Sequence, residues 1–231
     1  AMNDQLRERL LHQGRMAKLA ARELAVAPTT LKNQALLDMA DALVAGTEEI
    51  LAANRVDLEQ GEKAGLTSAL LERLMLNKKR IEDMAKGLRE IAALPDPVGQ
   101  VLGITRRPNG LEVGRVRTPI GVIGIIYESR PNVTADAAAL CVKAGNSILL
   151  RGGEEALNSN RAIARLIADA ATRAGLPEGA IQLVDSEDRE AAVFMMKMND
   201  YIDVLIPRGG KGLKQAVIEN ATVPVIMTGM G

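Results

Sequence analysis

The chain has 231 residues, with 29 basic and 29 acidic side chains, a 47% apolar fraction and 1% aromatic residues. This neutral balance offers no basic excess for nucleic acid or an anionic membrane, and so few aromatic rings disfavour stacking on single-stranded bases. The charged start AMNDQLRERL lacks a signal peptide's apolar stretch, and no stretch has the length of a membrane span. With Cys141 as its only cysteine, the protein is expected in the cytoplasm.

Residues 1–100 are predicted to be a helical segment that packs on the rest of the chain. Pro28 and Gly46 are expected to bound one helix, and Asn77 to cap another that Pro95 and Pro97 end. Apolar residues at helical spacing predict the faces turned to a core. They are Leu36, Met39, Ala40, Leu43 and Val44 in the first helix, and Ile81, Met84, Ala85, Leu88 and Ile91 in the second.

Residues 101–117 (VLGITRRPNGLEVGRVR) predict a β-hairpin. Asn109-Gly110 lies between two runs that contain β-branched residues. Both central residues of a type I′ turn need φ > 0, which this dipeptide tolerates. We therefore expect a hairpin closed at Asn109-Gly110.

Residues 118–231 alternate short apolar runs with helical runs. The expected strands lie at 120–128, 147–151, 180–185, 203–207 and 223–228, and the expected helices at 131–144, about 157–174, 187–198 and 210–220. Strands separated by helices form βαβ units in a parallel sheet, and continuous apolar runs such as VIGII suit strands covered on both faces. The sequence predicts an α/β fold with a doubly wound parallel sheet.

Glycines or ionisable residues follow each of these strands, as YESRPNVT (127–134), RGGEE (151–155), DSED (185–188), PRGGKG (207–212) and TGMG (228–231), and three of these turns are rich in glycine. Ligands of such sheets bind beyond the carboxyl ends of the strands, so the turns favour a nucleotide site on one rim. Neither G-x-G-x-x-G nor GxxxxGK[ST] is present, which argues against a conventional Rossmann dehydrogenase and a P-loop enzyme.

Arg151 ends the second expected strand, where the adenosine ribose of a dinucleotide lies in such sheets. A carboxylate at this place suits NAD, whereas a basic residue suits the 2′-phosphate of NADP. An ordinary surface arginine is the alternative, and Glu154 or Glu155 could hold a ribose hydroxyl. Gly209 and Gly210 open a helix whose N–H groups could hold a phosphate, or they form a plain strand–helix turn.

No nucleophile, base or metal site is evident. Cys141 lies in a helix among small apolar residues and is expected to be buried, and His12 is the only histidine. The sequence ends at a strand, directly after Thr-Gly-Met-Gly, with no closing helix. We expect a catalytic domain outside this chain.

The runs ALPDPVGQ, YESRPNVT, ILLRGG and YIDVLIPRGGKGL resemble the γ-glutamyl phosphate reductase family of the aldehyde dehydrogenase superfamily. The resemblance implies NADPH-dependent reduction of L-glutamate 5-phosphate to L-glutamate 5-semialdehyde in proline biosynthesis, through a cysteine thioester. It also implies a homo-oligomer, association with a glutamate 5-kinase, and a catalytic cysteine beyond residue 231, so this chain alone should be inactive. A bifunctional synthase and a stand-alone nucleotide-binding or regulatory module are the alternatives.

By this resemblance, Asn132 donates to the developing oxyanion, with a helix N-cap as its alternative role. Arg130 is a candidate for the substrate phosphate or a carboxylate. Arg151 matches the superfamily lysine that contacts the adenosine ribose and the 2′-phosphate. The remaining candidates for the cofactor are Gly152, Gly153, Glu154, Pro207, Arg208, Gly209 and Gly210. The whole interpretation requires Arg151, Asn132 and Arg208 on one rim of the sheet.

Overall fold

The computed structural model describes residues 2–228. Its N-terminal part consists of five helices: α1 (Asp4–Leu24), α2 (Thr29–Ala45), α3 (Thr47–Lys63), α4 (Ser68–Leu74) and α5 (Lys78–Ala93). Short polar side chains begin several of them. The Asn77 side chain accepts from the Arg80 amide at 2.8 Å, as predicted, and Asn3 caps α1 in the same way.

Both predicted apolar stripes face the interior of the protein. Leu36, Met39, Ala40 and Leu43 of α2 are fully buried, and so are Ile81, Ala85 and Leu88 of α5. The last residue of each stripe departs from the pattern. Val44 is 42% exposed and Ile91 is half-buried, although their neighbours Leu43 and Ala92 are buried.

A four-stranded parallel sheet forms the centre of the molecule, in the order β5-β4-β3-β6. Its strands are β3 (Val122–Tyr127), β4 (Ser147–Arg151), β5 (Ile181–Leu183) and β6 (Val204–Arg208). They are joined by α6 (Asn132–Lys143), η1 (Glu154–Ala156), α7 (Leu157–Ala174) and α8 (Arg189–Met195), and α9 (Lys211–Asn220) follows β6. The predicted doubly wound α/β fold is confirmed.

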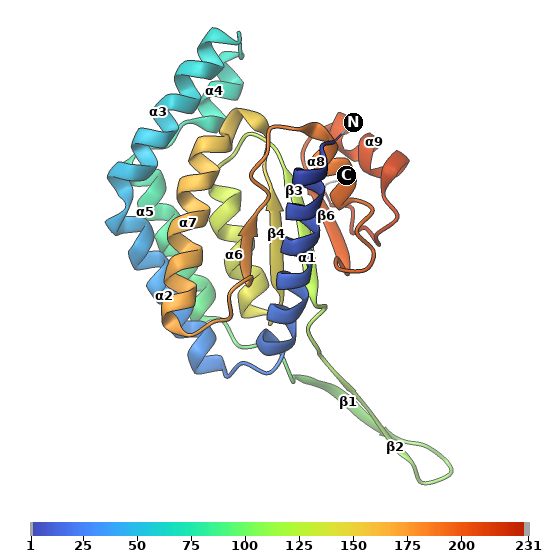
Figure 1. Cartoon of the computed structure of the whole chain (residues 1–231). Helices are drawn as coiled ribbons and strands as arrows, with labels where there is room; N and C mark the ends of the chain where they lie inside the picture. The colour runs from blue at the N-terminus through green and yellow to red at the C-terminus, as the bar shows by residue number, and fades with distance from the viewer. Residues whose placement is uncertain (1, 229–231) are drawn as a thin grey trace.

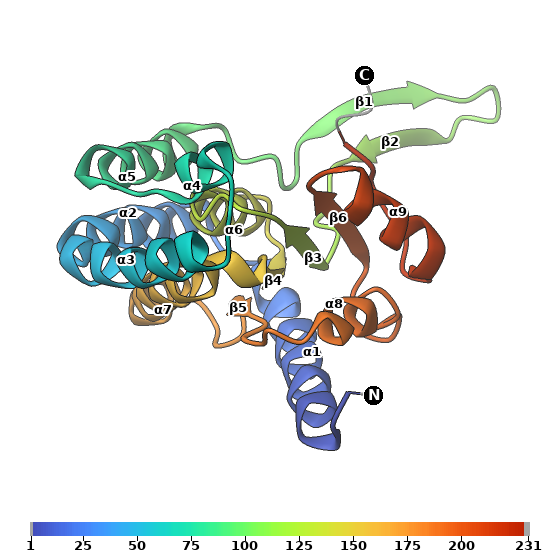
Figure 2. The same cartoon turned by 90° about the horizontal axis from the view of Figure 1, so that it is seen from above.

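Helices cover both faces of this sheet (Figures 1 and 2). Ile123, Ile125 and Tyr127 of β3 point into a core built with α2, α5, α6 and α7. Val122 and Ile126 point the opposite way, into a second core with α1, α8 and α9. This alternation along one strand explains why VIGII is apolar throughout.

The strand predicted at 223–228 is wrong for the described residues. Only a single parallel bridge joins Leu205 and Val225. Leu205 donates to the Pro224 carbonyl at 2.8 Å and accepts from the Ile226 amide at 3.0 Å. Since Pro224 has no N–H and the segment lies at the sheet's edge, the pairing does not extend.

The predicted hairpin is confirmed as β1 (Val101–Arg106) and β2 (Glu112–Val116), two exposed antiparallel strands that extend away from the body (Figure 1). The type I′ turn is wrong, because Asn109 has no positive φ and Gly110 alone has one, at 88°. A two-residue loop at Asn109-Gly110 would require an N–H from Pro108, which has none. The Arg107 amide instead donates to the Leu111 carbonyl at 2.7 Å, with Gly110 in the left-handed region.

Candidate functional site

The carboxyl ends of the parallel strands form one rim. Arg151 of β4 lies opposite Ile126 of β3, and Arg208 of β6 lies opposite Tyr127. The loop from Tyr127 to Asn132 leaves β3 between them. Because β4 and β6 lie on opposite sides of β3, the loops after β3 and β6 diverge there, which is where open sheets of this kind bind ligands. Arg151, Asn132 and Arg208 therefore lie at the same end of the sheet, as the sequence predicted.

The loop after β3 is held in a strained conformation. Ser129 has φ = 61° and is the one non-glycine residue with positive φ in the described part of the chain. The Arg130 amide donates to the Glu128 carbonyl at 2.7 Å, which closes a γ-turn around Ser129. The Glu155 carboxylate accepts from the Ser129 amide at 2.6 Å. These hydrogen bonds therefore hold Ser129, at the rim, in a backbone conformation that non-glycine residues disfavour.

The first turn of α9 is already in contact with an acidic side chain. Gly210 is the N-cap of α9, and its amide donates to Glu128 Oε2 at 3.1 Å. A Cβ on Gly209 would lie 2.6 Å from the same oxygen, so the carboxylate's approach requires glycine there. One of the N–H groups predicted to hold a phosphate, that of Gly210, thus holds the chain's own carboxylate, which a bound phosphate would have to displace.

A cavity of about 770 Å³ lies on the α8 and α9 side of the rim. This volume is within the usual range for small-molecule sites. Its polar lining includes Arg151, Glu154, Glu155 and Arg189, and its apolar lining includes Ala192, Val193, Met196, Leu213 and Ala216. Arg189 pairs with Glu154 at 3.1 Å and is 85% exposed. Nothing in the sequence predicted Arg189 as a site residue, because it is one of several charged residues after β5.

Arg151 is not a surface arginine, since only 6% of it is exposed. Its Nη1 donates to the Gly152 carbonyl at 2.7 Å and its Nη2 to the Asp188 carbonyl at 3.3 Å. Its Nε is buried without a hydrogen-bond partner. Burial lowers the pKa of Arg151, while nearby Glu154 and Glu155 oppose this shift. Arg151 joins the end of β4 to the segment before α8, and its Nε is a buried donor without a partner.

A buried hydrogen-bond network positions α6 beside the rim. The Tyr127 hydroxyl lies 2.6 Å from Thr134 Oγ1, which donates to Asn160 Oδ1 at 3.1 Å. Burial raises the pKa of Tyr127 far above its ordinary value, so its hydroxyl stays protonated. The network joins β3, α6 and α7, and therefore fixes where α6 begins.

Asn132 is the first residue of α6, but it does not cap the helix. The N-cap is Pro131, with no side-chain cap, so the capping interpretation is wrong. Instead, Asn132 Nδ2 donates to Asp136 Oδ2 at 3.2 Å. Burial raises the pKa of Asp136, against the opposing effects of this hydrogen bond and of the charge on Arg208. The Asn132 amide retains a second N–H for another acceptor.

Two further cavities, of about 1000 Å³ and 460 Å³, lie on the α6 side of the rim, and both are lined by Arg73, Arg130 and Asp136. The larger one reaches Pro207, Arg208, Gly209 and Gly210, and the smaller one includes Asn132. Glu128 and Ser129 line both the larger cavity and the cavity beside α8 and α9. The strained loop therefore lies where the two sides of the site meet.

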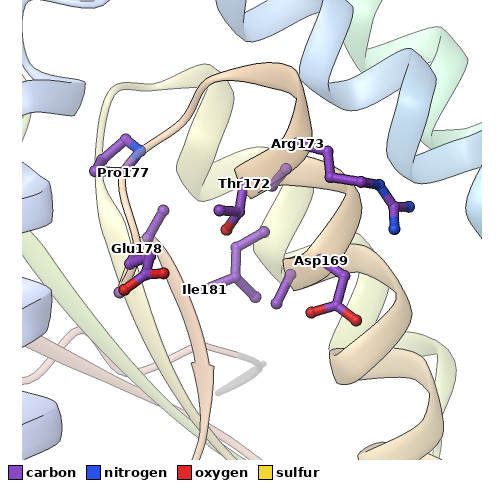
Figure 3. A pocket seen from close by; sticks show the side chains of 10 residues that line it. Asp169, Thr172, Arg173, Pro177, Glu178 and Ile181 are labelled. Atoms are coloured by element: carbon purple, nitrogen blue, oxygen red, sulfur yellow. The ribbon is translucent and has the colours of Figure 1, made fainter.

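Other features of the described residues lie apart from this site. A cavity of about 360 Å³ lies between the carboxyl end of α7 and the start of β5, at the opposite ends of these elements from the rim, and is lined by Asp169, Thr172 and Glu178 (Figure 3). Cys141 is buried, and burial raises the pKa of its thiol to about 12, so it is not a nucleophile. Residues 2–228 contain no cluster of metal ligands and no helix long and apolar enough to cross a membrane.

Sequence comparison finds the aldehyde dehydrogenase family over residues 7–229. A γ-glutamyl phosphate reductase from Syntrophomonas wolfei is 76% identical over 230 residues, which is 100% of this chain and 55% of that protein. One from Clostridium novyi is 60% identical over 216 residues, covering 94% of this chain and 52% of that protein. The chain thus spans about half the length of the curated relatives that it matches.

Solved structures agree with these relatives. The γ-glutamyl phosphate reductase from Thermotoga maritima superposes with a TM-score of 0.92 at 44% identity, covering 96% of this chain and 54% of that one. The enzyme from Saccharomyces cerevisiae gives 0.87 at 32% identity, covering 98% and 56%. An engineered glycolyl-CoA reductase with bound NADP⁺, at 0.66 and 19% identity over 94% of this chain and 46% of that one, shares the fold.

Proposed function

This chain belongs to the aldehyde dehydrogenase family, and we propose that it forms the cofactor-binding half of a γ-glutamyl phosphate reductase. The complete protein would use NADPH to reduce L-glutamate 5-phosphate to L-glutamate 5-semialdehyde in proline biosynthesis. The observation that carries the proposal is the rim: Arg151, Arg208 and the strained loop surround cavities at the carboxyl ends of parallel strands. Its homo-oligomeric state and its association with a glutamate 5-kinase stay predictions.

The residues beside α8 and α9 fit NADP. Apolar side chains of both helices suit an adenine ring, and Glu154 suits a ribose hydroxyl. Arg151 lines this cavity, and exposed Arg189 adds a second positive charge for the 2′-phosphate. Gly153 lines the same cavity, whereas a Cβ on Gly152 would lie 2.1 Å from the Asn160 amide nitrogen, so Gly152 serves the packing behind the site. The turn Pro207–Gly210 would receive the pyrophosphate once Glu128 moves aside.

The α6 side of the rim fits the reacting group of the substrate. Asp136 holds one N–H of Asn132 and so orients the amide, whose second N–H would donate to the oxyanion that forms on the attacked carbonyl. Arg130 would face the acyl phosphate. Bound NADPH supplies the hydride. The thiolate that forms the thioester is proposed to come from the other half of the complete protein, since Cys141 is buried and protonated.

Calorimetric titration of the chain with NADP and with NAD tests the cofactor assignment. We expect NADP to bind more tightly, because two arginines lie where the 2′-phosphate would bind. Equal affinities, or no binding of either dinucleotide, would contradict it.

An activity assay tests whether the nucleophile lies outside this chain. The 231-residue chain should not oxidise glutamate semialdehyde in the presence of NADP and phosphate, whereas the complete protein should. Turnover by the chain alone would refute the assignment of the nucleophile to the other half.

A further inference from the structure

Arg73 and Arg130 come together from distant parts of the sequence. Arg73 lies in the last turn of α4, and both side chains line the two cavities on the α6 side of the rim. Neither side chain has a hydrogen-bond or ion-pair partner within residues 2–228. Arg80, at the start of α5, differs, because it donates to the Met75 and Glu72 carbonyls at 2.6 and 2.8 Å and pairs with the Glu72 carboxylate. Arg80 thus fixes the connection after α4, while Arg73 has its donors unused.

Asp136 adds an acidic group to the lining of the same two cavities. It is half-buried, accepts from Asn132 on its own helix, and lies close to Gly87 of α5. Arg208 of β6 influences its charge without forming an ion pair with it in the described structure. A site for phosphate alone would not be expected to include a carboxylate, because the two negative charges repel. A free guanidinium beside a carboxylate matches a ligand that carries both charges.

We propose that Arg73 and Asp136 recognise the amino-acid end of the substrate, with Arg73 binding the α-carboxylate and Asp136 the α-ammonium group. The inference rests on the proposed function and adds the residues that select an α-amino acid. Arg73 lies on α4, away from the sheet, and Arg130 lies directly after β3. This arrangement puts the α-carbon, with its carboxylate and ammonium groups, away from the rim and the acyl phosphate toward it.

The binding test uses L-glutamate, whose γ-carboxylate stands in for the acyl phosphate. Glutarate lacks the ammonium group and 4-aminobutyrate lacks the α-carboxylate. By calorimetry, the unmodified chain should bind L-glutamate about tenfold more tightly than either compound, since each loses one charge-assisted contact. Arg73→Gln should weaken L-glutamate about tenfold and leave 4-aminobutyrate unchanged, and Asp136→Asn should reduce L-glutamate to the level of glutarate. Arg89→Gln is the matched control, because Arg89 is an exposed arginine of α5 that pairs with Asp41.

NADP is titrated in parallel to separate this subsite from the proposed function. NADP binding without detectable L-glutamate binding, or with equal affinity for L-glutamate and glutarate, overturns the subsite and leaves the cofactor assignment intact. L-Glutamate binding with the predicted variant effects but without NADP binding supports the subsite and contradicts the cofactor assignment. If Asp136→Asn unfolds, the comparison of L-glutamate with glutarate on the unmodified chain still decides.

Discussion

Asp57 of α3 should be among the costliest side chains to remove. It is 2% exposed, and its carboxylate accepts four hydrogen bonds from the first turn of α7. The backbone amides of Asn158 and Ser159 donate at 3.2 and 2.7 Å, and their side chains at 2.9 and 2.6 Å. Asp57 therefore caps α7 from another helix, next to the cavity assigned to the cofactor.

Asp57→Ala removes the cap and leaves two amides at a helix N-terminus without their acceptor. A lost cap costs about 1 kcal/mol, and each buried group left unsatisfied costs about 1–3 kcal/mol. Because Ser159 is fully buried, its backbone amide and its hydroxyl lose their acceptor inside the protein. Since these contributions overlap, we expect a loss of about 3 kcal/mol in the free energy of unfolding. For a chain of this size, that corresponds to a fall in Tm of about 6–12 °C.

Urea and thermal unfolding of Asp57→Ala measure this loss. Asp169→Ala is the control, because Asp169 lies on α7 with an exposed side chain and only a 3.8 Å pair with Arg165. That control should change the free energy by less than about 0.5 kcal/mol. A loss below about 1 kcal/mol for Asp57→Ala, or one equal to the control's, would refute the capping argument.

Three further predictions concern the cofactor, catalysis and pH. Arg151→Ala should narrow the affinity gap between NADP and NAD about tenfold, and an unchanged gap in calorimetry would remove Arg151 from the 2′-phosphate site. In the complete enzyme, Asn132→Ala should lower kcat by about 10²–10³-fold, whereas a near-normal rate would contradict oxyanion donation. Burial tends to raise the pKa of Asp96, but hydrogen bonds, first from Lys32, hold it below its ordinary value of 3.8. This stabilisation is present above pH 3.8 and is lost as the pH falls through the lowered pKa, so urea midpoints should drop there, and less steeply in Lys32→Met.

The fold could be predicted because its signals are local. The strand at 147–151 and the helix at 157–174 have the predicted bounds, since an apolar run, a glycine pair and a helical stripe delimit them. The last strand and the hairpin turn were predicted wrongly because a proline, which has no backbone N–H, interrupts the hydrogen bonding that the apolar pattern suggested. Pro224 limits the last strand to a single bridge, and Pro108 prevents the two-residue turn.

Only those site residues that lie at the ends of strands could be predicted from the sequence. Arg151 and Arg208 end parallel strands, and topology alone brings such residues to one rim. Arg73 and Asp136 lie within helices, where a charged residue usually means a solvated face. Only the tertiary structure shows that they line a common cavity. Likewise, no sequence pattern indicates that Glu128 reaches the first turn of α9.

The central claim is that NADP binds in the cavity beside α8 and α9. A crystal structure of the chain grown with NADP tests this claim most directly. The adenosine should lie between α8 and α9, its 2′-phosphate within hydrogen-bond distance of Arg151 or Arg189, and the Glu128 carboxylate should have left the Gly210 amide. NADP bound elsewhere, for example in the cavity between α7 and β5, would contradict the account.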